Sequence, residues 1–561
     1  MNRYNHRMVG LLSSSVVLVV FTSIISPFPQ PVQAFGVNPS TTTATLSTRR
    51  PNCATGKILS RIGPLQEKST NLNPFTSFVG DMVASVKSTM SCSSSQINQD
   101  LDETLNILVS TTWEDIQTNL ESKQTPDEKA FRSNVDKGIG PPSPLNKIRL
   151  FDESNKEEDI RVTLYRDHAS WCPYCQKVWM TLEEKRIPYR VEKINMRCYG
   201  DKPREFMRLQ PSGAVPVAII DGTVYNQSND IMFALESIFS EHKPLLPPED
   251  DQMSRMKAQD LMRLERTLFS AWMYWLTGSE RSKGNFIRVL NEVESALQTN
   301  KGGDFFMGEK VSIVDFMFAP FLERMCASMI FFKGFQIRVA KGQRTDYPAI
   351  NKWFDAMEQL PSYVVTKSDY YTHAWDLPPQ LGGCVREEKG ELFERAINGE
   401  RLMDNSRGSW DLPLVPDLGG IEPDWGFCGD ENAAKREAAE RLSFNHKNIV
   451  LFAARGAGSK GMPPFSAPLA DPNAKPNESV YQSVDTFLRL ITIALLDGHE
   501  SVASDMAKVA QEVRSTGEEH TQNVVKSLSY LRDRVGVPRD MKLPAARQLR
   551  AHINFAISYM L

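Results

Sequence analysis

Two cysteines separated by two residues provide the clearest chemistry in this sequence. Cys172 and Cys175 stand in the run Ser-Trp-Cys-Pro-Tyr-Cys, after a short apolar run at 162–165 and before a segment with helical periodicity at 178–185. The pair is therefore predicted to lie where a strand leads into a helix. Cys172 would occupy the helix N-terminus, where free backbone N–H groups and the helix dipole favour a thiolate. Cys175, one turn later, would attack a mixed disulfide formed on Cys172.

A Cys-x-x-Cys pair also forms half of many zinc sites. The sequence has no second pair of this kind and no histidine pair at zinc spacing, and His168 is the only histidine nearby. Half of a zinc site and simple packing of the two thiols are the alternative interpretations, and thiol redox chemistry is favoured over both. No bound metal is expected.

The composition is that of a soluble globular protein with several domains. The chain has 561 residues, of which 41% are hydrophobic and 24% charged, and its formal net charge is -3. A chain of this length predicts about three or four folded units. The nearly balanced charge gives no attraction to nucleic acid, so no such partner is expected. The eight cysteines are few and scattered, which favours a reducing compartment over a disulfide scaffold.

The first fifty residues predict targeting signals. Residues 1–34 contain basic residues, an apolar run and small residues at the end, which is typical of a secretory signal peptide; a membrane anchor is the alternative. Residues 35–51 are hydroxyl-rich, basic and free of acids, as in transit peptides. The Ala34-Phe35 junction resembles the bipartite presequence of algae with secondary plastids, which implies delivery to the plastid stroma; the secretory pathway is the alternative. The mature protein is not expected to span a membrane.

The remaining chain divides into four regions by pattern. Residues 52–135 predict a helical N-terminal extension, and the Gly- and Pro-rich segment 136–160 predicts a linker. Residues 161–248 alternate between strand and helix periods in the order βαβ-α-ββα, the order of the thioredoxin fold. Beyond residue 249 the patterns are almost entirely helical.

Residues 161–374 resemble a glutathione transferase, with a thioredoxin-like N-terminal domain (161–248) and an all-helical C-terminal domain (249–374). Besides the cysteine motif, three features carry the resemblance: Val215-Pro216, Gln227-Ser228, and the helix-start box formed by Ser312 and Asp315. The resemblance implies a cis peptide before Pro216 and a Val215 backbone that pairs with the cysteinyl part of glutathione.

The resemblance also assigns the rest of a glutathione site. Ser228 would offer its hydroxyl and a helix N-terminal amide to the γ-glutamyl carboxylate, while Gln227 stands where the family usually has Glu. Lys202 is near the position of the lysine that faces the glycine carboxylate. Tyr174 is expected to shape the groove and to donate a hydrogen bond to a sulfur, with simple packing as the alternative.

A cysteine at the active position indicates the omega-like, lambda-like and dehydroascorbate-reductase-like branch of the family. The second cysteine and the long C-terminal extension, 375–561, resemble the iota class most. This resemblance implies a thioltransferase or reductase that uses glutathione as co-substrate on small oxidised or electrophilic substrates or glutathionylated proteins. It also implies a homodimer, unless the added segments block the pairing surface. The alternatives are a non-catalytic scaffold for an aromatic ligand or cofactor, and a module that docks on a plastid complex.

The extension itself is predicted to be mostly helical, with helices near 433–446, 480–496 and 503–535. The sequence Trp-Asp-Leu-Pro occurs twice, at 375–378 and 410–413, and loops that pack on neighbouring helices are the favoured prediction for both copies. A duplicated clamp, or two loops that present a tryptophan to a groove, are the alternatives. The sequence assigns no role to this region.

Overall fold

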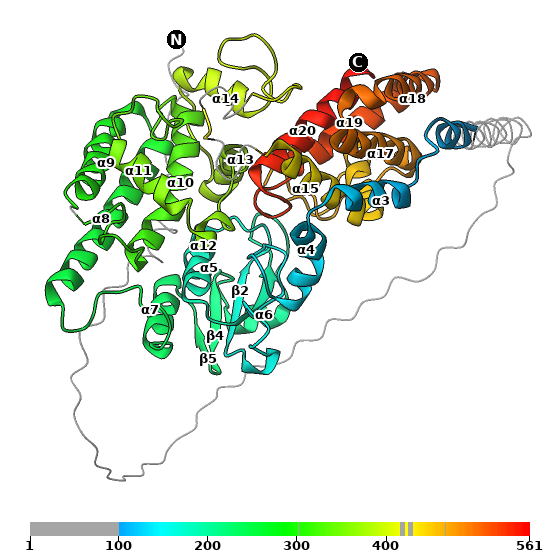
Figure 1. The fold of residues 1–561 in the computed structure, drawn as a ribbon. Helices are drawn as coiled ribbons and strands as arrows, with labels where there is room; N and C mark the ends of the chain where they lie inside the picture. Colours follow the sequence, from blue (N-terminus) through cyan, green and yellow to red (C-terminus); the bar gives the residue numbers. More distant parts are fainter. Residues whose placement is uncertain (1–99, 301, 416–420, 424–429, 466) are drawn as a thin grey trace, which may run out of the picture. The chain divides into compact units, whose positions relative to one another are not determined.

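The computed structural model describes residues 100–561 apart from 301, 416–420, 424–429 and 466 (Figure 1). The predicted signal peptide, the transit segment and residues 52–99 of the N-terminal extension lie outside the described residues. In the described part of the chain, no helix combines the length and the apolar character that a membrane crossing requires.

A five-stranded mixed sheet forms the α/β part of the protein. Its strand order is β1-β3-β2-β4-β5, in which β2 and β3 are parallel and the other neighbours are antiparallel. The parallel pair is joined through helix α5, and helices α6 and α7 complete the unit. The elements are β1 (Ile148–Arg149), β2 (Val162–Asp167), α5 (Pro173–Lys185), β3 (Tyr189–Ile194), α6 (Arg204–Leu209), β4 (Val217–Ile220), β5 (Thr223–Tyr225) and α7 (Ser228–Ile238). Apart from the added edge strand β1, this is the predicted thioredoxin-like arrangement.

The two faces of this sheet are covered by different helices, because successive side chains of a strand point to opposite sides. Leu164 of β2 belongs to the large core that also holds residues of α5 and α7. The next residue, Tyr165, packs on the other face, where Phe206 of α6 meets Val217 of β4. The strand that leads to the start of α5 is therefore packed on both faces of the sheet.

A helical part follows the sheet and is built around α10, all of whose residues are buried. Ser312 and Asp315 form the predicted capping box at its start, with the Ser312 N–H donating to the Asp315 carboxylate at 2.8 Å. The helices are α8 (Gln252–Leu276), α9 (Lys283–Gln298), α10 (Ile313–Lys333), α11 (Pro348–Met357), α12 (Pro361–Val364), α13 (Tyr370–Leu381) and α14 (Glu391–Ile397). Helix α10 contacts α5, so the helical part lies directly against the helix that begins after Cys172.

The remaining helices come from both ends of the chain and share a second hydrophobic core. Residues Leu105, Trp113 and Ile116 from the N-terminal side pack with residues 438–560. The Trp113 indole N–H donates to the Asp485 carboxylate at 2.8 Å. The helices of this module are α3 (Trp113–Lys123), α15 (Glu431–Phe444), α16 (His446–Ala453), α17 (Tyr481–Asp497), α18 (Ala503–Ser515), α19 (Glu518–Arg534) and α20 (Leu543–Ser558). The two extensions therefore form one helical module, which Figure 1 shows with α3 beside α15 and α17.

Three local predictions differ from the structure. The first Trp-Asp-Leu-Pro copy, Trp375–Pro378, lies within helix α13 and is not a loop. The helix predicted at 503–535 is divided in two at Gly517, whose φ of 118° lies in a region that favours glycine. The segment 136–160, predicted as a linker, contains the end of α4 (Pro126–Lys137) and contributes β1 to the sheet edge.

Candidate active site

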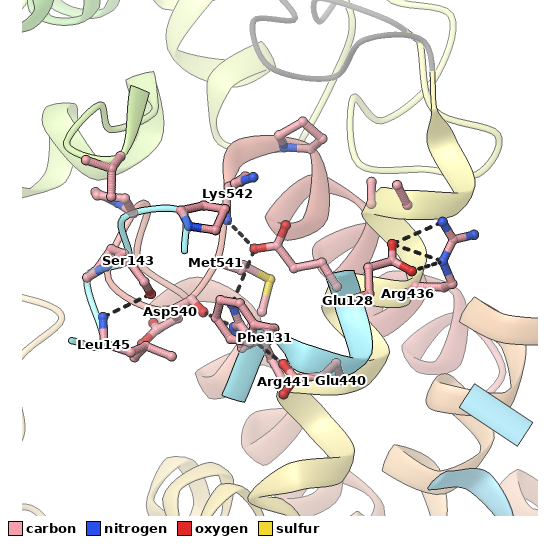
Figure 2. A pocket seen from close by; sticks show the side chains of 18 of the residues that line it. Glu128, Phe131, Ser143, Leu145, Arg436, Glu440, Arg441, Asp540, Met541 and Lys542 are labelled. Carbon is pink, nitrogen blue, oxygen red and sulfur yellow. Dashed lines mark hydrogen bonds and ion pairs between the residues drawn. The ribbon is translucent and has the colours of Figure 1, made fainter. Parts of the chain in front are cut away.

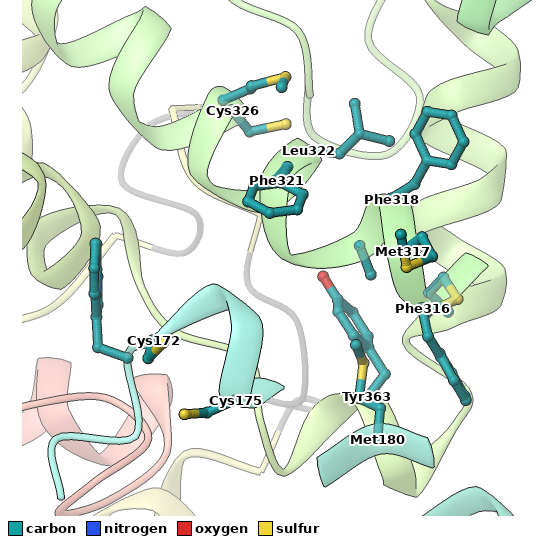
Figure 3. Close-up of a cluster of buried hydrophobic side chains, with 14 of the residues drawn as sticks. Cys172, Cys175, Met180, Phe316, Met317, Phe318, Phe321, Leu322, Cys326 and Tyr363 are labelled. Atoms are coloured by element: carbon teal, nitrogen blue, oxygen red, sulfur yellow. The ribbon is translucent and has the colours of Figure 1, made fainter. Parts of the chain in front are cut away.

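Cys172 is the residue immediately before α5, and Cys175 lies in the first turn of that helix (Figure 3). Pro173 begins the helix, where its missing N–H costs nothing. Cys172 is 7% exposed and Cys175 is 1% exposed. Burial, followed by a hydrogen bond with the Cys172 sulfur, raises the pKa of Cys175 well above its usual value. Both thiols are thus buried, Cys172 slightly less than Cys175, and Cys175 is held as a thiol.

A buried carboxylate lies beside the two sulfurs. Asp167, the last residue of β2, is 1% exposed, and the three ligand atoms of Asp167, Cys172 and Cys175 all lie within 4.8 Å of one another. One carboxylate oxygen accepts a 2.6 Å hydrogen bond from the Trp171 N–H. The other oxygen, Oδ1, is buried and has no hydrogen-bond partner in the described part of the chain. An unpaired buried oxygen is costly, and the carboxyl group that carries this one lies beside the two thiols.

The same three groups are the residues that can hold a metal ion. They offer two sulfurs and one oxygen, and among the described residues no fourth Cys, His, Asp or Glu belongs to the cluster. A closed structural zinc site uses four protein ligands, so this set does not complete one.

Several cations fix and surround the loop that carries Cys172. Arg324 of α10, 1% exposed, donates to the Trp171 carbonyl oxygen and places its guanidinium 4.9 Å from the indole ring. Lys177 is buried on α5 and donates to the Asn229 side chain at 2.9 Å. Burial lowers the pKa of Lys177 to about 7. Lys177, Lys202 and Arg324 are all within electrostatic range of Cys172.

The Val215-Pro216 peptide is cis, as the resemblance implied. The Cys172 Sγ lies 3.8 Å from the Val215 carbonyl oxygen, so this backbone borders the thiol. The Val215 N–H makes no backbone hydrogen bond to the described residues. This N–H is therefore open to a strand-like partner.

The other predicted glutathione contacts lie around this backbone with different exposures. Ser228 begins α7 and is buried, with the exposed Gln227 just before it. Lys202 is half-buried, and its ammonium donates to the Asn195 carbonyl oxygen. Burial lowers the pKa of Lys202.

Tyr174 faces the helical part of the protein. Its ring meets Phe321 of α10 edge-on at 5.7 Å, and its hydroxyl lies beside Arg266 of α8. Burial raises the pKa of the Tyr174 phenol. These contacts support the packing interpretation, and the predicted hydrogen bond to a sulfur is not among the contacts of the described chain.

Comparison with known proteins agrees with this arrangement. The family model described as glutathione S-transferase, N-terminal domain, matches residues 171–238, and that for the C-terminal domain matches 277–356. Glutathione S-transferase DHAR2 of Arabidopsis thaliana is 30% identical over 169 residues, which cover 30% of this chain and 72% of that protein. The chain belongs to the glutathione S-transferase family.

Two further proteins resemble this transferase over a similar part of the chain. Glutathione S-transferase DHAR3, chloroplastic, of Arabidopsis thaliana is 29% identical over 30% of this chain and 59% of its own length. The crystal structure of Chlamydomonas reinhardtii dehydroascorbate reductase matches 36% of this chain and 91% of that chain, at 21% identity and a TM-score of 0.29. The similarity to these relatives thus concerns about a third of the transferase.

Two cavities of this transferase lie away from the cysteines. One, of about 420 Å³, has a largely apolar wall that includes Phe131, Leu145 and Met541, and Figure 2 shows the Glu128–Arg436 ion pair at its edge. The other, of about 740 Å³, reaches the active-site loop at His168. Neither is lined by a residue that the sequence predicted for glutathione.

Sequence reasoning missed Asp167, Lys177 and Arg324. Asp167 had a weak signal in the sequence. It stands just after the predicted strand and just before the cysteine motif, and an acidic residue is rarely as buried as this one is. Lys177 stands on the same helix as the cysteines, but only the structure shows that it is buried. Arg324 comes from a helix far along the chain, and nothing local in the sequence marks it.

Proposed function

We propose that this transferase uses glutathione to reduce mixed disulfides and small oxidised substrates, with Cys172 as the nucleophile. The observation that carries the proposal is the position of the Cys172 Sγ, at the N-terminus of α5 and 3.8 Å from the Val215 carbonyl oxygen. A helix N-terminus favours the negative charge of a thiolate, and the adjacent backbone can align a peptide thiol against it. The DHAR relatives support glutathione-dependent reduction as the reaction class.

The proposed first step is a thiol–disulfide exchange on a glutathionylated substrate. The Cys172 thiolate attacks the glutathione sulfur, a new S–S bond joins Cys172 to glutathione, and the substrate leaves as a thiolate that takes up a proton. A second glutathione thiolate then attacks the glutathione sulfur of the adduct and releases oxidised glutathione, which restores the Cys172 thiolate. For dehydroascorbate the balance is the same: two glutathione thiols become one disulfide, and the substrate accepts two electrons and two protons.

Cys175 offers a second route that needs no second glutathione for resolution. Its sulfur attacks the Cys172 sulfur of the adduct, the internal disulfide forms, and glutathione leaves as a thiolate. Because burial keeps Cys175 protonated at neutral pH, the attack requires a proton acceptor. We assign this role to Asp167, because one of its carboxylate oxygens lies within 4.8 Å of both sulfurs and its Oδ1 has no hydrogen-bond partner among the described residues. Glutathione later reduces the internal disulfide and returns the enzyme to its starting state.

Glutathione binding is proposed to use backbone and helix-end groups. The cysteinyl part would pair with the Val215 backbone, and the γ-glutamyl carboxylate would meet Ser228 at the start of α7. Gln227 lies beside the proposed position of the γ-glutamyl carboxylate. The Lys177 ammonium donates a hydrogen bond to Asn229, the residue after Ser228. Lys202 is proposed to face the glycine carboxylate, which requires its ammonium to release the Asn195 carbonyl oxygen.

The test combines mass spectrometry with turnover. After incubation with oxidised glutathione, Cys175→Ser should carry one glutathione, Cys172→Ser should carry none at this motif, and Cys384→Ser should behave as the wild type. Turnover of a glutathionylated peptide and of dehydroascorbate should disappear in Cys172→Ser and persist in Cys384→Ser. An unmodified Cys172 in Cys175→Ser, with no turnover by the wild type, would leave a ligand-binding scaffold or a docking module as the function.

We further propose that the protein acts in the plastid stroma, on the strength of the composition of residues 1–51. Fusion of these residues to a fluorescent protein in an alga with a secondary plastid tests this. Fluorescence in the plastid supports the proposal, and secretion of the reporter would contradict it.

A further inference from the structure

The 740 Å³ cavity, here called the extension cavity, lies where the terminal helices meet the active-site loop. Its walls come from the loop at His168 and Ala169, from α13, from residues 441–455 and from residues 530–541. Cavities of this size commonly bind small molecules. The catalytic thiols and the proposed glutathione contacts are not among its lining residues, so it is a separate site.

Guanidinium groups stacked on aromatic rings form part of this wall. Arg132 lies 3.8 Å from the Phe444 ring centre, and Arg534 lies 3.5 Å from that of Tyr530. The Tyr530 ring in turn packs against Phe452 at 5.2 Å, and all of these residues line the cavity. Each such surface combines a flat aromatic ring with a positively charged guanidinium group, and this combination suits a planar aromatic ring that carries an acidic group.

The wall of the cavity holds one arginine that forms no ion pair with any described residue. Five arginines and four aspartates line the cavity, and four of the arginines are paired: Arg132 and Arg441 with Glu440, Arg534 with Asp471, and Arg539 with Asp540. One of the aspartates, Asp376, is buried, and burial raises its pKa to about 7, so its negative charge is partly lost at neutral pH. Arg455 makes no ion pair within the described residues, and its guanidinium lies 5.5 Å from the Phe452 ring centre.

Two polar atoms at the wall are left without partners. The Arg534 Nε and the His168 Nδ1 are both buried and make no hydrogen bond to the described chain. Arg534 still holds an ion pair with Asp471 at 3.0 Å through another nitrogen, so the free Nε–H is an additional donor. A ligand with acceptor oxygens would satisfy a donor that the protein leaves unpaired.

From the stacked rings, the unpaired Arg455 and the free Arg534 donor, we propose that the extension cavity binds a planar aromatic anion, such as an aromatic carboxylate. This inference assigns a binding role to the C-terminal extension and does not depend on the glutathione reaction. The ligand would contact His168, in the loop that leads to Cys172.

The test uses 2-naphthoate and its neutral isostere 2-naphthamide as probes, with binding to the full-length protein measured by calorimetry. We expect naphthoate to bind more tightly than naphthamide. Arg455→Met, which keeps the aliphatic bulk, should weaken naphthoate binding by about tenfold or more, as expected for loss of a charged hydrogen bond, and leave naphthamide unchanged. Arg281→Met, the same change at an exposed arginine that does not line the cavity, is the matched control and should bind as the wild type.

Three results would overturn the proposal. The first is that naphthoate does not bind the wild type, and the second is that it binds Arg455→Met with unchanged affinity. The third is that S-hexylglutathione displaces naphthoate, which would place naphthoate in the active-site groove. Thermal melting of each variant checks that it is folded. Because Arg455 is only half-buried, its substitution should leave the melting temperature near that of the wild type.

Discussion

Replacement of Asp167 by Asn tests the proposed proton transfer from Cys175. Asn has the same shape and keeps an oxygen to accept the 2.6 Å hydrogen bond from the Trp171 N–H, but it cannot take up a proton. A positioned general base contributes about 10²- to 10⁴-fold. The carboxylate and the sulfurs lie within 4.8 Å, a limit longer than direct hydrogen-bond reach, so we use the low end of that range. Formation of the internal disulfide should slow about 100-fold at pH 7.

The two steps of the reaction should respond in opposite directions. Loss of a negative charge beside Cys172 should leave its attack on oxidised glutathione unchanged or faster, while resolution by Cys175 slows. The glutathione adduct should therefore accumulate in Asp167→Asn, as it should in Cys175→Ser. The difference from the wild type should shrink at high pH, because Cys175 then ionises without a base.

The assay mixes reduced protein with oxidised glutathione, quenches with an alkylating reagent at a series of times, and counts adduct and internal disulfide by intact mass. Asp376→Asn is the matched control, since it removes another buried aspartate that interacts electrostatically with Asp167 but is not in the sulfur cluster. Equal rates of internal disulfide formation in Asp167→Asn and the wild type, in proteins with similar melting temperatures, would refute the role of Asp167.

Three further substitutions test the energetics of the fold by urea unfolding. Burial raises the pKa of Asp376 from 3.8 to about 7, so between these values the folded protein binds more protons than the unfolded chain. The free energy of unfolding of the wild type therefore falls as the pH rises through this window. Asp376→Asn does not titrate and should gain up to about 4 kcal/mol relative to the wild type between pH 4 and pH 8. Asp315→Ala removes the acceptor of three N–H groups, among them the Trp353 indole at 2.9 Å, and should cost about 3 kcal/mol or more. Arg550→Met leaves Asp369, its partner at 2.6 Å, as an unpaired buried charge; we expect a loss of about 3 to 5 kcal/mol, part of which the added change Asp369→Asn should restore. These assignments would be contradicted if the stability difference between Asp376→Asn and the wild type did not change with pH, or if Asp315→Ala and Arg550→Met lost less than about 1 kcal/mol.

The thioredoxin-like part could be predicted because its signals are local. Alternating strand and helix periods placed Cys172 before a helix, and the structure begins α5 at the next residue. The capping box of Ser312 depends on neighbours within a few residues, so the sequence pattern and the contact that stabilises it occupy the same short stretch of chain. The cis peptide at Pro216, in contrast, was expected from the family resemblance and not from the local sequence.

Features that depend on distant contacts could not be predicted in this way. The two copies of Trp-Asp-Leu-Pro have the same four letters, but Trp375–Pro378 continues a helix that is capped by Asp369. The second copy, with Trp410 buried against Tyr371, lies outside any helix. The pairing of the N-terminal helices with the C-terminal module, as in the hydrogen bond of Trp113 to Asp485, joins residues hundreds of positions apart, and composition alone does not indicate it.

The C-terminal extension supports the loop that carries Cys172 through a continuous series of buried contacts. Arg550 of α20 is paired with Asp369, the residue that caps α13. His373, in the first turn of α13, is within 2.7 Å of the Glu323 carboxylate on α10.

The next residue of α10, Arg324, donates a hydrogen bond to the carbonyl oxygen of Trp171, the residue before Cys172. Each of these side chains is nearly inaccessible to water, so none can shift without leaving a buried charge or polar group unpaired. Because helix α13 belongs to both the helical transferase part and the start of the extension, no domain boundary can fall within it. The extension is therefore part of the structure that fixes the active-site loop, and substitutions in α20 should alter the reactivity of Cys172 without touching it.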